Sequence, residues 1–288
     1  MPRVAVVGSY GVGLTFGSAR VPERGETVIG TLFRTDDGGK GSNQAVGAAR
    51  LGAEVSFLTA VGEDTFGDRA HELWKTEGVD ASAVVRSAEP TMTAAILVEE
   101  SGDNRIVIVP GALATLTPAD VDGFSPQIEA ADILLVQLEI PVGTALHALA
   151  VGRAAGVRTV LNPAPAPAEP ITPVADYVVP NETEARAIPR SAATLVVTLG
   201  EQGARIGVDV VPAFPARVVD STGAGDAFCA AFAVAVAEGA SDLDAVRWGC
   251  AAGAHMVEHP GVIPGLPSRA ALEERLTVTA VGSTEATR

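Results

Sequence analysis

The sequence predicts an α/β fold in which helices cover both faces of a parallel sheet. Short apolar runs alternate with helical stretches along most of the chain, an alternation typical of strands joined by crossover helices. Alanine, valine and glycine are abundant, as expected where small residues pack helices onto buried parallel strands. With 288 residues, the chain is long enough to bury a large core in one or two domains.

The expected elements follow one another in the order strand, helix, strand. The first strand is expected over residues 4–7, and it enters a loop that is dense in glycine. Further short apolar strands are expected at 55–60, 133–137, 159–162, 177–179 and 195–198. Helices are expected at 41–51, 66–77 and 142–155, and a long apolar helix follows the loop at 220–226.

Two segments interrupt this rhythm, because residues 27–34 and 91–109 show no helical periodicity. The second segment contains two β-rich runs joined by Ser101-Gly102-Asp103-Asn104, a composition that favours a hairpin. We therefore predict an α/β domain made of residues 1–9, 37–88 and 111–288, with a small separate sheet made of 10–36 and 89–110. The last residues, about 278–288, lack periodicity and are expected to fray.

The charge of the chain restricts its partners. Thirty-five acidic and 20 basic side chains give a net charge of −15, and no basic run is present. Such a surface repels nucleic acid and anionic lipid, so neither is an expected partner. The sequence shows neither a leader pattern nor an apolar run of membrane-spanning length, which favours a cytoplasmic location. Cys229 and Cys250 lie in apolar segments and are expected to be buried thiols.

The glycine-rich loop after the first strand raises the hypothesis of a dinucleotide-binding turn. Gly11, Gly13 and Gly17 nearly match the required spacing, and Asp36-Asp37 lies at a suitable distance downstream. That fingerprint has to open a helix, whereas residues 14–30 contain a proline and three glycines that oppose one. We therefore expect a strand that runs into an open loop and then into the small sheet, which disfavours a nicotinamide-dependent dehydrogenase.

The strongest chemical signal is VVDSTGAGDAFCAAFAVAVAEG at 218–239. Gly223 and Gly225 permit a tight turn whose N–H groups face one point at the start of the following helix, an arrangement that binds anions. Asp226 falls in the first helical turn, where it could accept a proton from a hydroxyl that attacks a phosphoryl group. The alternative is an ordinary helix N-terminus with a capping aspartate.

A second glycine-rich turn, DDGGKGSNQAVGAARLG at 36–52, precedes another helix. Together with the GAGD at 223–226, it closely resembles the two signatures of the ribokinase-like (PfkB-type) carbohydrate kinases. Shorter segments resemble the family in the same order along the chain: RGET at 24–27, VGEDTFGD at 61–68, VQLEIP at 136–141, LNPAPA at 161–166, PNETEA at 180–185 and VTLGEQGA at 197–204.

The resemblance implies a ribokinase-like parallel sheet sandwiched by helices, with the small inserted β-sheet as a lid. It also implies phosphorylation of a hydroxyl on a sugar or sugar-like molecule, with ATP, Mg²⁺ and K⁺ as cofactors. A small sheet has an exposed face and edges that a partner usually covers, so we expect a homodimer formed through the lid.

The resemblance also assigns roles to individual residues. Asp226 matches the catalytic base, and Gly223, Ala224 and Gly225 match the anion hole. Residues on the sugar side are Gly11, Gly13, Gly39, Lys40, Asn43 and Glu139; those on the nucleotide side are Asn181, Thr198, Gly200, Gly203 and Cys250. Glu184 matches a residue that organises Mg²⁺ through water, and Asp220 and Thr222 match part of a monovalent-cation site. Asn181 with Glu184 can equally cap a helix.

Three departures from the family pattern lie on the sugar side. Gly11 and Gly13 stand where ribokinases carry Asn and Asp, and Leu113 stands where Asn is common. These changes predict a roomier, more apolar pocket and an acceptor other than ribose. A fourth departure, the short connection at 185–194, could alter the adenine pocket.

Two alternative functions remain open at this point. The first is a nucleoside kinase of the same fold, although only Tyr10, Phe16 and Phe33 could stack on a base from the lid. The second is a non-catalytic sensor of sugars or nucleotides, which the missing sugar contacts favour weakly and the intact Asp226 opposes.

Overall fold

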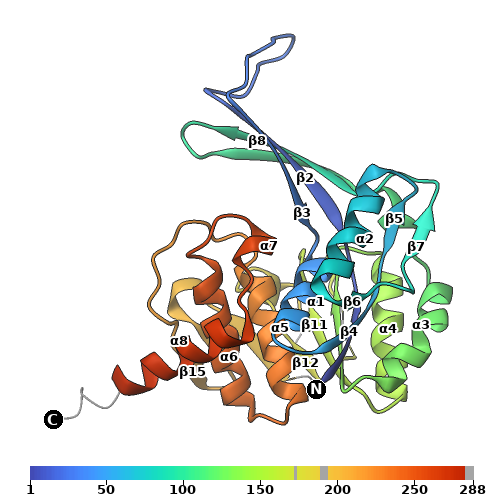
Figure 1. Cartoon of the computed structure of the whole chain (residues 1–288), viewed down its shortest axis with the longest axis vertical. Helices are drawn as coiled ribbons and strands as arrows, with labels where there is room; N and C mark the ends of the chain where they lie inside the picture. The colour runs from blue at the N-terminus through green and yellow to red at the C-terminus, as the bar shows by residue number, and fades with distance from the viewer. Residues whose placement is uncertain (172–173, 189–193, 283–288) are drawn as a thin grey trace.

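A nine-stranded sheet crosses the centre of the molecule (Figure 1). The computed structural model describes residues 1–171, 174–188 and 194–282. Strands pair in parallel from β13 to β6, whereas β14 is antiparallel to both of its neighbours. The spatial order is β15 (Asp209–Val211), β14 (Ala204–Ile206), β13 (Thr194–Thr198), β12 (Tyr177–Val178), β11 (Arg158–Asn162), β10 (Ile133–Gln137), β1 (Arg3–Val7), β4 (Glu54–Leu58) and β6 (Val79–Asp80).

Alternating side chains of the central strands divide the hydrophobic core into two layers. Val4 and Val6 of β1 join one core cluster, while Ala5 and Val7 join the other. Helices on the first side are α1 (Lys40–Arg50), α2 (Thr65–Glu77), α5 (Ala224–Ala237), α6 (Asp242–Met256) and α8 (Arg269–Gly282). Helices on the second side are α3 (Pro118–Ala130) and α4 (Val142–Ala154). The predicted α/β fold, with a parallel sheet covered on both faces, is confirmed.

Short elements join the main ones. The strand expected at 55–60 is divided, because β4 ends at Leu58 and β5 (Ala60–Gly62) pairs instead with β7 (Val85–Ser87). The remaining short elements are the helix α7 (Val262–Gly265) and three 3₁₀ turns, η1 (Gly111–Thr115), η2 (Glu184–Arg186) and η3 (Gly200–Gln202).

The small sheet stands away from the α/β domain and has four strands in the order β3-β2-β8-β9 (Figure 1). They are β3 (Leu32–Gly38), β2 (Gly11–Ser18), β8 (Thr93–Glu99) and β9 (Asn104–Val109). The hairpin predicted within 91–109 is confirmed as β8 and β9, and Gly102 takes the positive φ of 91° in its turn.

Two expectations for this sheet are wrong. Residues 11–18 form a strand rather than an open loop, because pairing with β3 and β8 on both sides satisfies their backbone despite the glycines. β3 starts at Leu32 and continues to Gly38, so the strand is shifted towards the C-terminus of the expected 27–34 segment.

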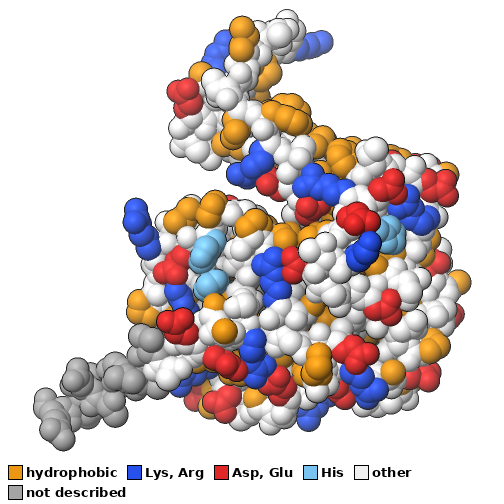
Figure 2. Space-filling view, viewed as in Figure 1, with side chains coloured by type: hydrophobic (Ala, Val, Ile, Leu, Met, Phe, Trp, Pro, Cys, Tyr) orange, Lys and Arg blue, Asp and Glu red, His pale blue; other side chains and the backbone are white. Residues whose placement is uncertain are grey.

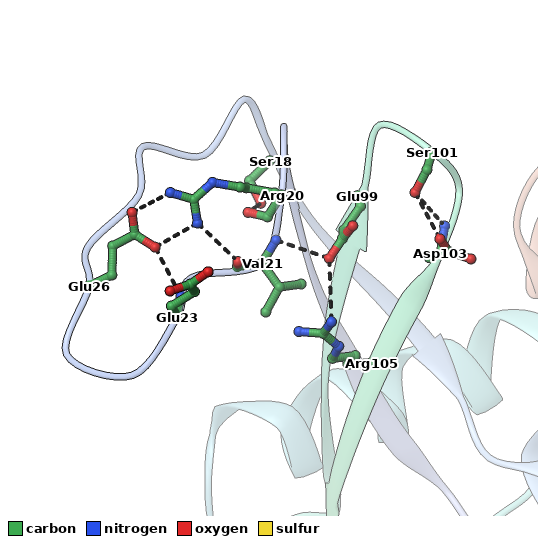
Figure 3. Close-up of polar contacts among 9 residues, drawn as sticks. All are labelled: Ser18, Arg20, Val21, Glu23, Glu26, Glu99, Ser101, Asp103 and Arg105. Carbon is green, nitrogen blue, oxygen red and sulfur yellow. Dashed lines mark hydrogen bonds and ion pairs between the residues drawn. The ribbon is translucent and has the colours of Figure 1, made fainter.

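The segment between β2 and β3 extends beyond the sheet and is held by polar contacts (Figure 3). Arg20 makes two bonds to the Glu26 carboxylate, including one of 2.6 Å from Nη1 to Oε2. The backbone N–H of Val21 donates to Oε1 of Glu99 over 3.1 Å, which joins this segment to β8. Exposed ion pairs contribute little to global stability, so these contacts mainly define the shape of the tip.

Helix α8 corrects the expectation for the C-terminus. It continues to Gly282, so the expected loss of regular structure from Val278 is wrong for 278–282. The helix is anchored upstream, where the buried side chain of Leu272 packs into the core and Arg269 bonds Glu238, the residue that follows α5. Residues 283–288 lie outside the described residues, as do 189–193 of the short connection at 185–194. Among the described helices, none has the length and apolarity needed to cross a bilayer.

A close backbone contact at Gly41 holds α1 against the end of β1. A Cβ on Gly41 would lie 2.5 Å from the Ser9 nitrogen and 2.6 Å from the Gly8 carbonyl carbon. The N–H of Ser42 donates to the Ser9 carbonyl over 2.8 Å at the same place. This contact fixes where α1 presents the side chains of its first two turns.

Replacing this glycine should therefore destabilise the protein. Gly41→Ala should lower the free energy of unfolding in urea by about 1–3 kcal/mol, because the added methyl meets backbone that has to move. Gly123→Ala in α3 is the matched control, since no heavy atom lies within 4 Å of its Cβ position. The control should be neutral or stabilising, because alanine is the better helix former. Equal stability of Gly41→Ala and the wild type would show that the contact does not constrain α1.

Candidate active site

Polar residues gather at the carboxyl ends of the parallel strands. Glu139 follows β10, Asn162 ends β11 and Asn181 follows β12. Ligands of open α/β sheets bind outside this edge. Two adjoining cavities of about 420 and 600 Å³ lie there and share Thr198, Gly200, Ser221 and Gly225 among their lining residues. The surface is also hollowed between the small sheet and the α/β domain (Figure 2).

Asp226 is the most buried carboxylate of this region, with 5% of its surface exposed. The side-chain amide of Asn43 donates to its Oδ2 over 2.7 Å, and the amide of Gln44 donates to its Oδ1 over 3.1 Å. A buried carboxylate is stable only when such donors replace its water. Each carboxylate oxygen keeps a further lone pair, which leaves Asp226 able to accept a proton.

One donor to Asp226, Gln44, is itself held by a chain of buried amides. Gln137 donates to Oε1 of Gln44 over 2.6 Å, and Gln44 also lies 3.3 Å from Oδ1 of Asn162. The amide nitrogen of Asn162 donates to the Val179 carbonyl over 2.8 Å. Our sequence reasoning gave Gln44, Gln137 and Asn162 no role. The available signal was a polar side chain at the end of a fully apolar strand or inside a helix of small residues.

Asn43 retains one unused polar atom that points to a ligand. Its Oδ1 is buried and has no hydrogen-bond partner among the described residues. A buried acceptor without a donor is costly, so this atom is suited to a hydroxyl placed beside Asp226. Asn43 therefore offers an acceptor to a ligand and a donor to the carboxylate.

Lys40 and Glu139 occupy the rim of the same site. Oε2 of Glu139 accepts the N–H of Lys40 over 2.9 Å and the hydroxyl of Ser9, which fixes the start of α1. The Lys40 side chain lines the smaller cavity. The negative charge of Asp226 raises the pKa of Lys40, with burial opposing this shift and Glu139 adding to it. Lys40 is thus a cation at neutral pH, close to where Asp226 lies.

The predicted anion hole is the N-terminus of α5. Gly223 is the residue before the helix and takes a positive φ of 81°, where a Cβ would lie 2.7 Å from Cγ1 of Val262. Ala224 and Gly225 begin the helix, and the space beside the Gly225 Cα is open. The first N–H groups of a helix lack intrahelical acceptors, and the helix dipole adds positive potential. An anion held here would lie next to Asp226.

Asn181 and Glu184 face the smaller cavity from the opposite side. The Asn181 N–H donates to Oε2 of Glu184 over 2.9 Å, while Oδ1 of Asn181 accepts the N–H of Glu184 over 2.8 Å. This reciprocal pair closes the turn that leads into η2, and its two bonds have the pattern of a capping box. Burial raises the pKa of Glu184, against the opposing effects of the Asn181 N–H and the Lys40 charge.

The Glu184 carboxylate fits Mg²⁺, because carboxylate oxygens are the protein ligands this ion takes, often through water. Within the described part of the chain, no group of three or more His, Cys, Asp or Glu side chains converges on a metal position. An ion at Glu184 would thus take most of its ligands from water and phosphate.

The larger cavity has mainly apolar walls. Phe214, Phe228 and Gly203 line it together with Cys250, whose Sγ lies 3.8 Å from the Val211 carbonyl. Burial raises the pKa of Cys250 to about 12, so it remains a thiol. Thr198 and Gly200 lie where the two cavities meet. A flat apolar group could enter here while its charged end reaches α5.

Asp220 organises the loop before the anion hole. Its two oxygens accept the N–H groups of Thr222 over 2.9 Å and Gly261 over 3.3 Å. Burial alone would raise the pKa of Asp220, but these bonds outweigh it and the nearby Arg34 charge also lowers the pKa. The N–H groups of Val219 and Asp220 both donate to the Val257 carbonyl. Any cation here would thus be held largely by backbone oxygens, with Asp220 shaping the loop.

The structure revises the space expected at the sugar-side glycines. A Cβ on Gly11 would lie 2.1 Å from Cε of Met92, so the roomier pocket expected at this position is wrong: Met92 fills it. Gly13 differs, since its Cβ position meets only Cδ1 of Ile96 at 3.4 Å and the Asp36 carbonyl at 3.8 Å. Leu113 is buried in the second core layer. Gly39 has a positive φ of 90° and lies close to the backbone of Tyr10, where a Cβ would come within 2.6 Å of the Tyr10 Cα.

Comparison with known proteins identifies the family of this site. The model for the pfkB family carbohydrate kinases matches residues 1–269. The chain is 39% identical to a ribokinase of Bacillus subtilis, covering 96% of this chain and all of that protein. It is 36% identical to a deoxyribokinase of Salmonella typhi over 80% of this chain and 84% of the relative.

A solved structure has the same fold as this chain. An Arabidopsis thaliana ribokinase complexed with ribose and ATP superposes with a TM-score of 0.85 at 29% identity, covering 96% of this chain and 98% of its own. These matches confirm the expected phosphotransferase with an alcohol acceptor. The chain belongs to the pfkB family of carbohydrate kinases.

Proposed function

We propose that the protein transfers the terminal phosphoryl group of ATP to a hydroxyl of a sugar or sugar-like acceptor. One observation carries the proposal: a carboxylate held by two amides, Asp226, lies in the first turn of a glycine-led helix where two cavities meet. The larger, apolar cavity suits the adenine. The space beside Asn43 and Asp226 suits the acceptor.

The chemical step follows from these positions. The oxygen of the acceptor hydroxyl bonds to the γ-phosphorus of ATP while Asp226 accepts the proton of that hydroxyl. The bond from the γ-phosphorus to the ADP oxygen breaks in the same step. The N–H groups of Gly223 to Gly225 stabilise the charge on the transferred group. Lys40 supplies a fixed positive charge, and Oδ1 of Asn43 accepts a second hydroxyl of the acceptor.

Two cations complete the proposal. Glu184, with Asn181, would hold Mg²⁺ through water, and the ion would neutralise phosphate charge. Asp220, Thr222 and the backbone near Val257 would form a site for K⁺ that sets the shape of the anion-hole loop.

We also propose that the small sheet acts as a lid that excludes competing water, and that two lids pair in a homodimer. The support is exposed apolar surface on the sheet, at Phe16, Phe33, Ile106, Val107, Ile108 and Val109. Sedimentation of the wild type would decide between monomer and dimer.

The first prediction concerns the proton acceptor. Asp226→Asn should lower kcat by a factor on the order of 10² or more, because the amide cannot take the proton. Its size is unchanged, so ATP affinity and folding should persist. Asp209→Asn, on the exposed strand β15, is the matched control and should retain full activity. Near-normal turnover of Asp226→Asn would remove Asp226 from the mechanism.

The second prediction concerns the monovalent cation. Activity should rise when K⁺ replaces tetramethylammonium at constant ionic strength, because a bound ion orders the loop at 220–223. Asp220→Asn should weaken this response, since its carboxylate holds the Thr222 and Gly261 N–H groups. Equal rates in K⁺ and in tetramethylammonium would leave Asp220 with a purely structural role.

The third prediction concerns the acceptor. We propose that ribose is not the preferred acceptor, because Gly11, Gly13 and Leu113 offer it no polar side chain. The kcat/KM for ribose should be lower than for another member of a panel of sugars, sugar acids and polyols. Gly13→Asp should raise the kcat/KM for ribose relative to that for the best panel member, since a Cβ at this position meets no atom closer than 3.4 Å and the residue has no positive φ. A wild type that prefers ribose to the whole panel would contradict the proposal.

A further inference from the structure

The two faces of the small sheet carry different chemistry. On one face, Asp37 accepts the hydroxyl of Tyr10 over 2.7 Å and Nη2 of Arg69 over 2.8 Å, and Nη1 of Arg69 also reaches Thr35. Arg69 belongs to α2, so this face of β3 is bonded to the α/β domain. The polar groups of Asp37 are therefore committed to holding the sheet in place.

The neighbouring residues of β3 point to the other face, because successive side chains of a strand alternate. Arg34 and Asp36 share this face and form an ion pair of 2.5 Å between Nε and Oδ2. β3 lies beside α7, and Val262 of α7 packs against Gly223 of the anion hole (Figure 1). The charge of Arg34 also acts on Asp220. This face of β3 therefore overlooks the loop that leads to Asp226.

Asp36 also lies directly opposite Gly13 in the antiparallel pair of β2 and β3. Directly opposed residues point to the same face, with Cβ atoms about 5 Å apart. Gly13 has no side chain, and a Cβ there would meet only Cδ1 of Ile96 at 3.4 Å and the Asp36 carbonyl at 3.8 Å. The partner of Gly11 on this face is Gly38. Along this part of β2 and β3, Asp36 is thus the carboxylate next to the position where Gly13 lacks a side chain.

We propose that Asp36, oriented by Arg34, binds hydroxyl groups of the acceptor and so determines which acceptor the enzyme takes. The inference rests on the proposed function. A carboxylate accepts two hydroxyl donors well, so the preferred acceptor is a polyol or sugar with at least two free hydroxyls remote from the phosphorylated one. Lid strand β3 thus supplies specificity, and the α/β domain supplies the chemistry.

The test compares acceptor and nucleotide parameters in matched variants. The panel is D-ribose, 2-deoxy-D-ribose, D-arabinose, D-xylose, D-fructose and ribitol, each with ATP. Asp36→Ala should raise KM for the best acceptor about 10- to 100-fold, as expected for a lost hydrogen bond to a charged group. KM for ATP should be unchanged. Asp103→Asn, at the exposed hairpin turn, is the control and should change neither parameter.

A second variant tests the position of the carboxylate itself. Adding Gly13→Asp to Asp36→Ala moves the carboxylate to the opposed position on the same face, so it should restore much of the lost acceptor affinity. Unchanged acceptor KM in Asp36→Ala, or an equal rise of both KM values without rescue, would overturn the inference while leaving the kinase function intact. A wild type that phosphorylates no panel member and gains no thermal stability from any would instead overturn the proposed function.

Discussion

The candidate site depends on a single arrangement, in which the buried carboxylate of Asp226 is shared between two helices. Asn43 and Asp226 are 183 residues apart in the chain, yet their side chains lie 2.7 Å from each other. A buried carboxylate without hydrogen-bond donors would cost several kcal/mol of stability. The side-chain amides of α1 therefore have to lie beside Asp226 at the start of α5. The close contact at Gly41 fixes the position of α1 against the end of β1. Gln137, at the end of β10, donates a hydrogen bond that orients the side chain of Gln44. Sheet, α1 and α5 are thereby fixed relative to one another around one ionisable group.

The parts of the site differ in how firmly they are built. Around Asp226, side chains are buried and joined by hydrogen bonds that cross from element to element. The small sheet has many exposed apolar residues, and its bonds to the α/β domain include those of Asp37 with Tyr10 and Arg69. The proposed arrangement, with the nucleotide on the densely bonded side and the acceptor under the small sheet, suits a reaction in which the acceptor has to enter and leave.

The sequence predicted the elements that carry strong periodicity and the motifs that carry unusual residue types. Strands such as β10 and helices such as α4 were predicted almost to the residue, because their apolar runs leave few alternatives. β2 was wrongly predicted to be a loop, because its glycines lower the local preference for a strand. The strand forms because β2 pairs with β3 on one side and β8 on the other. Met92 could not be placed beside Gly11 from sequence, because the two residues are about 80 positions apart in the chain. The amide chain through Gln44, Gln137 and Asn162 was missed for the same reason.

The adjacent pair Asp36-Asp37 illustrates how much depends on the register of one strand pair. In sequence the two acids look interchangeable, but Asp37 lies on the face of β3 that bonds Arg69 of α2, whereas Asp36 lies on the opposite face with Arg34. A slip by one residue would exchange their destinations, because side chains alternate with a period of two. Asp37 could then no longer meet Tyr10 and Arg69, so these bonds penalise the slipped pairing. The bonds of Asp37 with Tyr10 and Arg69 thus fix the register in which β3 pairs with β2. An insertion or deletion in the tip at 19–31 would therefore leave Asp36 on its own face of the sheet.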